Sequence, residues 1–162
     1  LASGGFSDGW APGSAMNLQY LSLRDCILLY AECLANDGEL SQAMNQVNKI
    51  RTRAGLEPNI IKINGVPAAN YKIATYPTTH AAFTDKATCI KAVRMERKLE
   101  LAMEGQRWFD LVRNNRLLEV MQKHKDKDGR LLFAGLQAFR QLWPIPQGEK
   151  DKNTNLTQNE GY

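Results

Sequence analysis

Apolar residues recur at helical spacing through the first third of the chain. From Asn17 to Asn36 they fall three and four residues apart, which predicts a helix that ends at the stop signal Asp37-Gly38. The same periodicity from Glu39 to Arg53 predicts a second helix, for which Ala54-Gly55 supplies the C-cap. Alanines on both stretches let two antiparallel helices approach closely, so we expect a helical hairpin with a tight turn.

This hairpin is similar to a single tetratricopeptide-like unit. Units of this kind cannot bury their apolar faces alone, because each relies on stacked neighbours. We therefore expect the 162-residue chain to expose an apolar face on its hairpin. It should then self-associate or need a missing N-terminal part of the same protein.

A third helical stretch, Cys89 to Arg113, carries acidic residues at a spacing that needs an explanation. Glu96, Glu100 and Glu104 lie four residues apart and so form one ridge, with apolar residues on both sides. Half-buried carboxylates at this spacing repel one another unless cations neutralise them, which predicts an internal network of ion pairs. The local candidates for these cations are Arg97, Arg107 and Arg113.

Backbone signals mark the limits of this stretch. Thr84 is the expected N-cap, and Asp85 complements the helix dipole. Inside a helix Gly105 costs about 1 kcal/mol relative to alanine, so it predicts a hinge at Glu104-Gly105 and a second short helix beyond it. A further short helix is expected at Leu117–Met121.

The chemical alternative for the glutamate ridge is a carboxylate metal site of the kind found in helical bundles. Such sites pair Glu with a His three residues later, and the two histidines, His80 and His124, lie outside the stretch. Neither histidine has a neighbouring motif that would orient it as a base, and no glycine-rich phosphate loop follows a strand. The residues favour a structural ridge, with no metal, no cofactor and no enzymatic activity.

Irregular segments hold the candidate ligand-binding residues. Residues 1–16 are rich in glycine and serine, which predicts a loop that carries Trp10. After the hairpin helices, Asn64-Gly65 predicts a small β-hairpin, and Tyr71 and Tyr76 follow in the same irregular segment. Exposed rings can stack on sugars, so these three aromatic residues are the candidates; the alternative is that their rings pack the loops onto the core.

Composition and charge narrow the class of protein. The net charge of +4 is mild and the basic residues are interspersed with acidic ones, so no concentrated basic face for nucleic acid is present. No apolar run approaches the length that spans a bilayer. Three cysteines without zinc-ligand spacing predict small buried thiols. Trp143, beside the fixed turn at Pro144, is expected to be a core residue.

Four motifs stand in a fixed order along residues 17–162. They are Leu28-Leu29-Tyr30-Ala31-Glu32 leading to Val47-x-x-Ile50-Arg51-x-Arg53-Ala54-Gly55-Leu56, then Arg94-x-Glu96-Arg97-x-x-Glu100-Leu101-x-x-Glu104-Gly105-x-Arg107-x-x-Asp110-Leu111, then Trp143-Pro144-Ile145-Pro146, and finally Asn155-Leu156-x-Gln158-Asn159-x-Gly161-Tyr162. Together they closely resemble the C-terminal signature of the SusD/RagB family, the nutrient-binding lipoproteins on the surface of Bacteroidetes. The family usually has proline at the place of Glu160, a small departure.

The resemblance implies a mainly α, SusD-like fold, with a tetratricopeptide-like hairpin and signature helices joined by irregular loops. It implies that residues 1–16 enter a C-terminal domain, residues 17–162, of a longer chain. The implied function is glycan binding at the bacterial cell surface, as the partner of a SusC-like TonB-dependent transporter. The implied location is the outer membrane, with a lipid anchor on an N-terminal cysteine that is not in this chain.

Two alternatives to this function stay open. The same scaffold can serve peptides or another nutrient, because the matched motifs determine the fold and carry no information on the ligand. A cytoplasmic helical-repeat adaptor that binds a partner protein is the alternative from a different class. The motif residues are assigned to the fold, and the ligand-binding candidates remain Trp10, Tyr71 and Tyr76.

Overall fold

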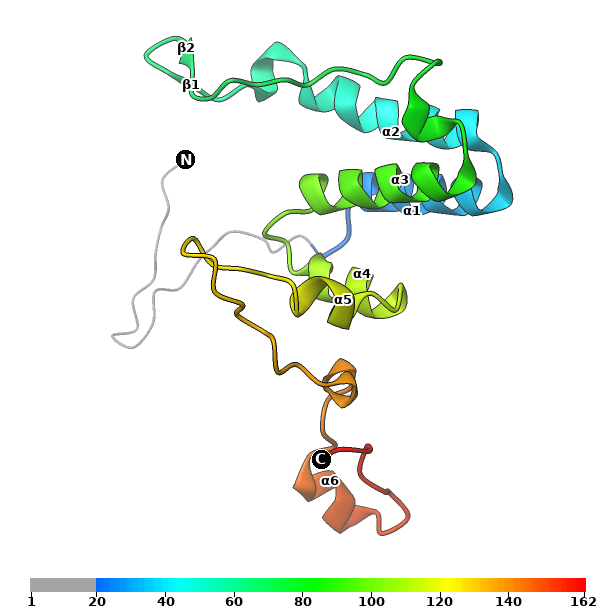
Figure 1. Ribbon diagram of the computed structural model, residues 1–162, viewed down its shortest axis with the longest axis vertical. Helices are drawn as coiled ribbons and strands as arrows, with labels where there is room; N and C mark the ends of the chain where they lie inside the picture. Colours follow the sequence, from blue (N-terminus) through cyan, green and yellow to red (C-terminus); the bar gives the residue numbers. More distant parts are fainter. Residues whose placement is uncertain (1–19) are drawn as a thin grey trace. The chain divides into compact units, whose positions relative to one another are not determined.

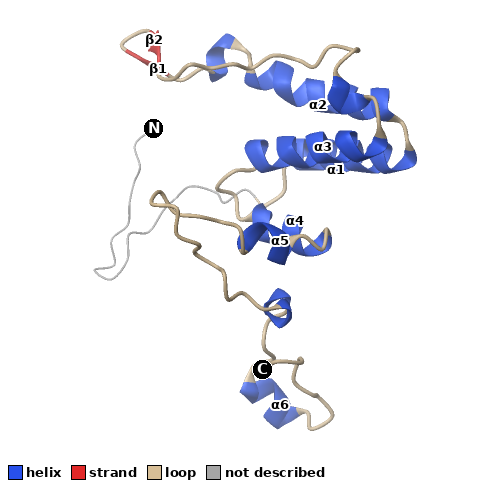
Figure 2. Ribbon diagram, viewed as in Figure 1, coloured by secondary structure: helices blue, strands red, loops and turns tan. Residues whose placement is uncertain are grey.

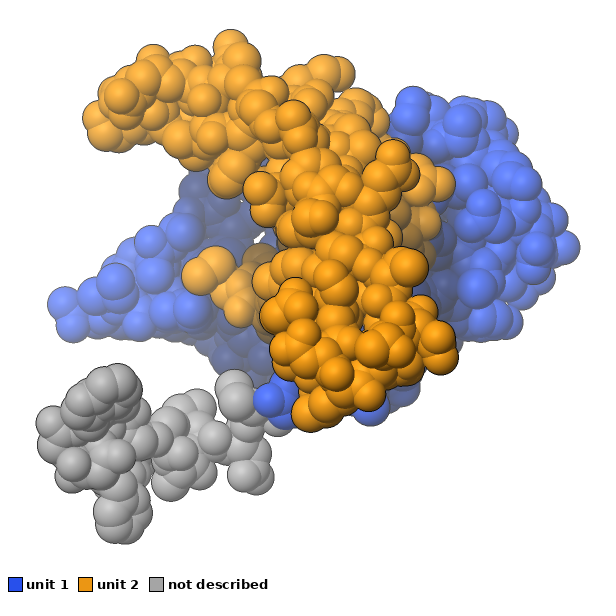
Figure 3. Space-filling view, turned by 90° about the horizontal axis from the view of Figure 1, so that it is seen from below, with its two compact units in different colours: residues 1–100 blue, residues 101–162 orange. Residues whose placement is uncertain are grey.

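Helices carry most of the regular structure in residues 20–162, the part of the chain that the computed structural model describes (Figures 1 and 2). One two-stranded antiparallel sheet accompanies them in that part of the chain. The predicted mainly α fold with at most a small β-hairpin is therefore confirmed. Contacts along the chain divide it into two units, Leu1–Glu100 and Leu101–Tyr162 (Figure 3). The loop predicted for residues 1–16 lies outside the described residues.

The first two helices form the predicted hairpin. Helix α1 spans Leu23–Asp37 and α2 spans Leu40–Ala54. Gly38 ends α1 at φ 88°, a left-handed conformation that favours glycine. The helix begins later than the predicted Asn17, because Ser22 has extended backbone and its hydroxyl accepts a hydrogen bond from the N–H three residues on.

Helix α3, Lys86–Glu100, starts at a different cap from the predicted one. A carboxylate oxygen of Asp85 accepts a hydrogen bond from the N–H of Thr88 at 3.0 Å, so Asp85 is the N-cap. Thr84 instead follows the 3-10 turn η2, Ala81–Phe83, and its hydroxyl donates back into that turn. The prediction of Thr84 was wrong by one residue, because both side chains have cap chemistry and only the backbone geometry separates them.

The signature helix ends before the predicted hinge. Helix α3 stops at Glu100, and residues 101–105 form turns before α4, Gln106–Arg113. Gly105 at φ 78° is the N-cap residue of α4, so the predicted break at this glycine is confirmed. Met103 also has a left-handed backbone, at φ 68°, and the helical backbone is therefore interrupted over several residues.

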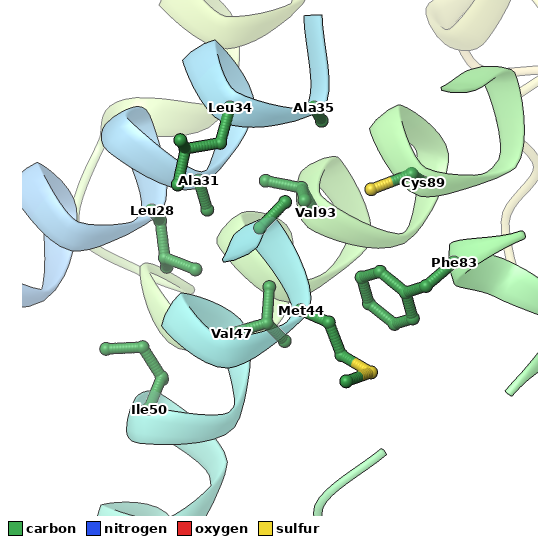
Figure 4. Close-up of a cluster of buried hydrophobic side chains, with 11 residues drawn as sticks. Leu28, Ala31, Leu34, Ala35, Met44, Val47, Ile50, Phe83, Cys89 and Val93 are labelled. Carbon is green, nitrogen blue, oxygen red and sulfur yellow. The ribbon is translucent and has the colours of Figure 1, made fainter. Parts of the chain in front are cut away.

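Three helices enclose the core of the first unit. Helices α1, α2 and α3 each contact the other two, and η2 contacts α2 and α3. Buried side chains from the three helices converge in Figure 4, where Phe83 of η2 joins them. The largest fully buried side chains of this cluster are Leu28, Val47, Cys89 and Val93. Helix α3 thus covers one side of the predicted hairpin.

The irregular segment after α2 contains the predicted β-hairpin. Strand β1, Lys62–Ile63, pairs with β2, Val66–Pro67, in an antiparallel ladder. Asn64 at φ 52° and Gly65 at φ 80° form the two-residue turn, with the positive φ angles of a primed turn. Proline is tolerated in β2 because a two-stranded ribbon leaves one edge of each strand unpaired.

Short helices build the second unit. Helix α5, Leu117–Met121, has the predicted bounds. It is followed by the 3-10 helix η3, Ala138–Gln141, and by α6, Gln147–Lys152. Leu111 of α4 and Leu117 of α5 are both buried, and the two helices contact each other.

Polar side chains of the C-terminal tail satisfy backbone groups of the preceding segment. The Gln158 amide bonds both backbone groups of Ile145, accepting from the N–H at 2.8 Å and donating to the carbonyl oxygen at 2.9 Å. Asn159 donates to the carbonyl oxygen of Trp143 at 2.7 Å. Trp143 is nevertheless 80% exposed, so the prediction that it is a core residue was wrong. The tail holds the backbone of this residue and leaves its ring uncovered.

Gly161 allows a direct test of the tail packing. Its φ is +90°, and a Cβ at this position would lie 2.7 Å from Cδ1 of Phe139. Gly129 has a similar φ of +83°, and a Cβ there would have nothing within 4 Å. Alanine at Gly129 therefore measures the cost of the backbone conformation alone. We expect Gly161→Ala to lower the free energy of unfolding by at least about 2 kcal/mol and Gly129→Ala by about 1 kcal/mol. Equal losses, measured by tryptophan fluorescence in denaturant, would contradict this packing.

Candidate functional site

The glutamates of α3 are paired with arginines from the other two helices. Glu96 accepts from Nη1 of Arg51 on α2 at 2.9 Å, and both side chains are largely buried, 8% and 17% exposed. Glu100 accepts from Nη2 of Arg53 at 2.5 Å and from Nη1 of Arg24 on α1 at 3.5 Å. The prediction of local cations was wrong for these two carboxylates, because their partners lie far away in the sequence.

Arginines of α3 bind acidic residues of α1 in return. The Arg97 side chain is 4% exposed, and its Nη1 donates to Oδ1 of Asp25 at 2.6 Å. Nε of Arg94 donates to Oε1 of Glu32 at 2.9 Å. We call the ion pairs of this unit the interhelical brace; its members are Arg24, Asp25, Glu32, Arg51, Arg53, Arg94, Glu96, Arg97 and Glu100.

The remaining charged residues of the signature belong to the second unit. Glu104 lies in the turn after α3, so the predicted single ridge of three glutamates was wrong at this residue. Arg113 donates to Oδ1 of Asp110 at 2.9 Å within α4. Burial lowers the pKa of the Arg107 guanidinium, and the nearby Asp110 carboxylate opposes that shift.

The carboxylates of the brace are paired with guanidinium groups, which indicates a structural role for them. Within residues 20–162, no three His, Cys, Asp or Glu side chains are placed together to hold a metal ion. Glu96 and Glu100 each have an arginine within 3 Å, and a guanidinium stabilises the ionised form of a carboxylate. This arrangement ties α3 to α1 and α2 and leaves neither glutamate available as a ligand or a base.

Two polar residues of α2 fasten the irregular segment between η1, Glu57–Asn59, and η2. Arg51 donates from Nε to the carbonyl oxygen of Ala74 at 2.5 Å, besides its ion pair in the brace. The Asn48 amide bonds both backbone groups of Tyr76, donating at 2.9 Å and accepting at 2.7 Å. The C-terminal end of the segment is thereby held on α2.

A hollow of about 350 Å³ is formed largely by residues of this same segment. It is formed within the first unit by the end of α2, the strand β2 and the stretch before Ala74. Its lining residues are Gly55, Ile60, Pro67, Ala69, Asn70, Tyr71 and Ile73. Tyr71 is 37% exposed, so it brings an accessible aromatic ring to a concave surface that also carries an amide. We call this surface the loop hollow.

The structure separates the three predicted ligand-binding residues. Tyr71 lines the loop hollow, whereas Tyr76 is part of the packing around the core. The Tyr76 ring lies edge-on to Phe83, with centroids 5.1 Å apart, and the Arg51 guanidinium lies 4.6 Å from its centroid. Trp10 lies outside the described residues. Of the two predicted residues that the structure describes, Tyr71 alone lines the loop hollow.

A second, more aromatic hollow lies within the second unit, and its residues were not among those predicted from the sequence. It measures about 470 Å³. Its lining residues are Trp108, Leu136, Arg140, Leu142, Trp143, Pro144 and Tyr162. The Arg140 guanidinium lies 5.3 Å from the centroid of the Tyr162 ring. Three of these residues, Trp108, Trp143 and Tyr162, come from three separate motifs, and no local pattern in the sequence indicates that their rings lie near one hollow.

The three thiols differ in exposure. Cys26 and Cys33 on α1 are exposed, so the prediction of three buried thiols was wrong for both. Cys89 is buried, and burial raises the pKa of its thiol, with the Asp85 carboxylate adding to the shift. A raised pKa lowers the fraction of thiolate, the form that acts as nucleophile.

Among the described helices, none is both long enough and apolar enough to cross a membrane.

Comparisons with known proteins point to one family. The family model described as "SusD family" matches residues 12–162. The chain is also 30% identical over 153 residues to a SusD-like protein, P38, of Formosa agariphila. The match covers 90% of this chain and 25% of that relative, so the chain spans about a quarter of the relative's length. No solved structure matches. Because the family match extends over almost the whole chain, the chain belongs to the SusD family.

Proposed function

We propose that this chain is the C-terminal portion of a surface lipoprotein that binds glycans for uptake. Membership of the SusD family, across residues 12–162, is the observation that carries the proposal. In this role the protein works with a SusC-like TonB-dependent transporter at the outer membrane, anchored there by a lipid on an N-terminal cysteine. Its task is to capture a nutrient, and it performs no catalysis.

The loop hollow supplies chemistry that suits a sugar. An aromatic ring stacks on the apolar C–H face of a pyranose, and amides hydrogen-bond its hydroxyl groups. Tyr71 offers the ring and Asn70 the amide from neighbouring positions. The volume of about 350 Å³ is at the small end of the range for ligand sites, which suits one or two sugar rings rather than a long chain.

The support beneath the loop hollow favours preorganised binding. Arg51 and Asn48 hold the backbone at Ala74 and Tyr76 from α2, so that end of the segment is fastened before a ligand arrives. A preorganised loop loses less conformational entropy on binding, and that loss is a main cost of recognition. We therefore assign Tyr71 to ligand contact and Tyr76 to support of the loop.

Replacing Tyr71 with alanine tests this assignment. We expect the affinity for the cognate oligosaccharide, found with a glycan array, to fall at least about tenfold in isothermal titration calorimetry, because the stacking surface is lost. The matched control is Tyr20→Ala, which removes a 77% exposed tyrosine outside the hollow and should leave the affinity unchanged.

Two results would contradict the proposal in different ways. If Tyr71→Ala binds the oligosaccharide as tightly as the unsubstituted chain does, the loop hollow is not the binding site. The proposal that the protein binds glycans would still stand. Heat from peptides, and none from any oligosaccharide, would overturn the glycan assignment and favour a peptide nutrient on the same scaffold.

A further inference from the structure

The hollow in the second unit contains an arginine without an acidic partner. We call it the aromatic hollow; it is the one of about 470 Å³ that Arg140 and Trp143 line. In the described part of the chain, the Arg140 side chain makes no hydrogen bond and no ion pair. By contrast, Arg113, Arg116 and Arg130 of the same unit each bind a carboxylate. A guanidinium carries several N–H donors, so Arg140 keeps its capacity to bind an anion.

Two aromatic rings hold this guanidinium in place. Its carbon atom lies 4.7 Å from the centroid of the Phe139 ring and 5.3 Å from that of the Tyr162 ring. Cation–π contacts of this kind orient the cation without using its N–H groups. The Tyr162 hydroxyl donates to the carbonyl oxygen of Leu142 at 2.7 Å, which fixes the second ring. The charge is therefore positioned before a ligand arrives, which lowers the entropic cost of binding.

Two indole rings provide a stacking surface in the same hollow. Trp108 of α4 and Trp143 both line it, and Trp143 is 80% exposed. Asn159 holds the backbone carbonyl oxygen of Trp143 at 2.7 Å, so this exposed ring stands on a fixed backbone. A flat exposed indole suits the apolar C–H face of a sugar ring. The volume of about 470 Å³ lies within the range for ligand sites.

The rest of the lining favours a negative charge on the ligand. None of the described residues that line the aromatic hollow is acidic, and Leu136, Leu142 and Pro144 form apolar walls beside Arg140. Such walls displace water, which strengthens the attraction between opposite charges. A neutral sugar would gain stacking and ordinary hydrogen bonds here. An acidic sugar would add a charge-assisted pair, which is about twice as strong as a neutral hydrogen bond.

We propose that the aromatic hollow binds an acidic sugar, a pyranose ring that carries a carboxylate or a sulfate ester. Trp143 stacks on the ring, and the Arg140 guanidinium binds the oxyanion through paired N–H donors. The inference rests on the proposed function, glycan capture, and adds to it a second site and a class of ligand. Trp143 belongs to a motif assigned to the fold, and its exposed ring here gains a ligand contact in addition.

Titration with matched acidic and neutral oligosaccharides tests this site. The sample is the intact protein, of which this chain is the proposed C-terminal portion. The probes are oligogalacturonates with their methyl esters, and sulfated galactan oligosaccharides with their desulfated forms. We expect at least one acidic probe to bind about tenfold more tightly than its neutral counterpart in isothermal titration calorimetry at low ionic strength. The pair that shows this preference identifies the oxyanion as carboxylate or sulfate.

Variants connect the preference to the aromatic hollow. Arg140→Gln should bring the affinities for the acidic and neutral probes within about twofold of each other, and Arg140→Lys, which keeps the charge and loses the fork, should retain part of the preference. Trp143→Ala should weaken binding of the acidic probe at least about tenfold.

Each of these variants has a matched control in the same unit. Arg130→Gln removes an arginine that pairs with Asp126, and Phe109→Ala removes a ring that is 63% exposed and is not among the lining residues. Neither control should change the affinity for the acidic probe. Far-ultraviolet circular dichroism checks that every variant is folded, and Arg140→Lys carries the test if Arg140→Gln is not.

The outcomes separate this inference from the proposed function. Equal affinity for the acidic and neutral members of both pairs, or an acidic preference that survives Arg140→Gln, would overturn the inference and leave glycan capture standing. Tighter binding of a polyglutamate peptide than of either acidic oligosaccharide would also overturn it, because the ligand of Arg140 would then be a peptide. The absence of heat with every oligosaccharide would overturn both proposals.

Discussion

Replacing Leu28 with alanine should lower the free energy of unfolding by about 2–5 kcal/mol. Leu28 is 0% exposed and lies among the side chains that α1, α2 and α3 bring together (Figure 4). Removing three carbons from the centre of a three-helix core leaves a cavity that the surrounding helices fill only in part. Urea denaturation followed by far-ultraviolet circular dichroism measures the loss.

Leu99→Ala is the matched control for this substitution. Leu99 lies on α3 and is 59% exposed, so the same change in chemistry removes few contacts. We expect its effect on the free energy of unfolding to stay below about 1 kcal/mol. Similar losses for the two leucines would mean that the three helices do not form a close-packed core around Leu28.

Replacing Arg51 with methionine should cost about 3–5 kcal/mol of unfolding free energy. The substitution keeps much of the side-chain volume and removes the cation, which leaves Glu96 buried without its arginine. It also removes the hydrogen bond to the carbonyl oxygen of Ala74 and the cation–π contact with Tyr76. The variant should therefore also weaken ligand binding at the loop hollow. Circular dichroism in urea measures the first effect, and isothermal titration measures the second.

The control for Arg51 lies two residues away on the same helix. Lys49 is exposed and donates to the Gln46 side chain, so Lys49→Met removes a charge with no buried partner. Its effect should stay within about 0.5 kcal/mol. If Arg51→Met lowers the free energy of unfolding as little as Lys49→Met does, another group must stabilise the Glu96 carboxylate. The Arg51–Glu96 pair would then not be essential to the brace.

Local patterns predicted the elements of the fold well. Hydrophobic periodicity gave the two helices of the hairpin, the α5 bounds agreed at both ends, and Asn64-Gly65 gave the β-hairpin. Gly105 marked the break after α3 because its left-handed backbone favours glycine. Each of these features depends on residues within a few positions of one another. Patterns in a single sequence are informative about structure over that short range.

Such local patterns did not predict the ion pairs between residues that lie far apart in the sequence. The glutamate ridge correctly indicated buried carboxylates in need of cations, yet Arg51 and Arg53 lie more than forty positions from Glu96 and Glu100 along the chain. Spacing within one helix favours local partners, and the tertiary fold replaced them with arginines from α2. The family signature was informative about both sides of this pairing, because the Arg51-x-Arg53 and Glu96-x-x-x-Glu100 motifs both belong to it.

Exposure was the property that sequence reasoning judged least well. Cys26, Cys33 and Trp143 have apolar character and were expected in the core, but all three are exposed in the structure. An apolar residue is buried only when another element covers its face, and the sequence of one element does not say whether that cover exists. The expectation of an exposed apolar face on the hairpin agrees with the structure, since Leu23, Leu29 and Tyr30 of α1 are exposed.

The functional assignment rests on a fold that carries a ligand loop. The brace ties three helices together, α2 fastens the loop at Tyr76, and Tyr71 lines the loop hollow. Under the proposed function, we expect the signature residues of the brace to contribute to binding through the position of the loop, without contact with a ligand. This division agrees with the assignment of the motif residues to the fold.

A double-mutant cycle on Arg51 and Glu96 tests the central claim, that the signature glutamates form an internal brace and not a reactive centre. The four proteins are the unsubstituted chain, Arg51→Met, Glu96→Met and the double variant, each unfolded in urea. We expect a coupling energy of at least about 1.5 kcal/mol, with the double variant more stable than Arg51→Met alone. Additive losses, with a coupling energy within about 0.3 kcal/mol of zero, would contradict it.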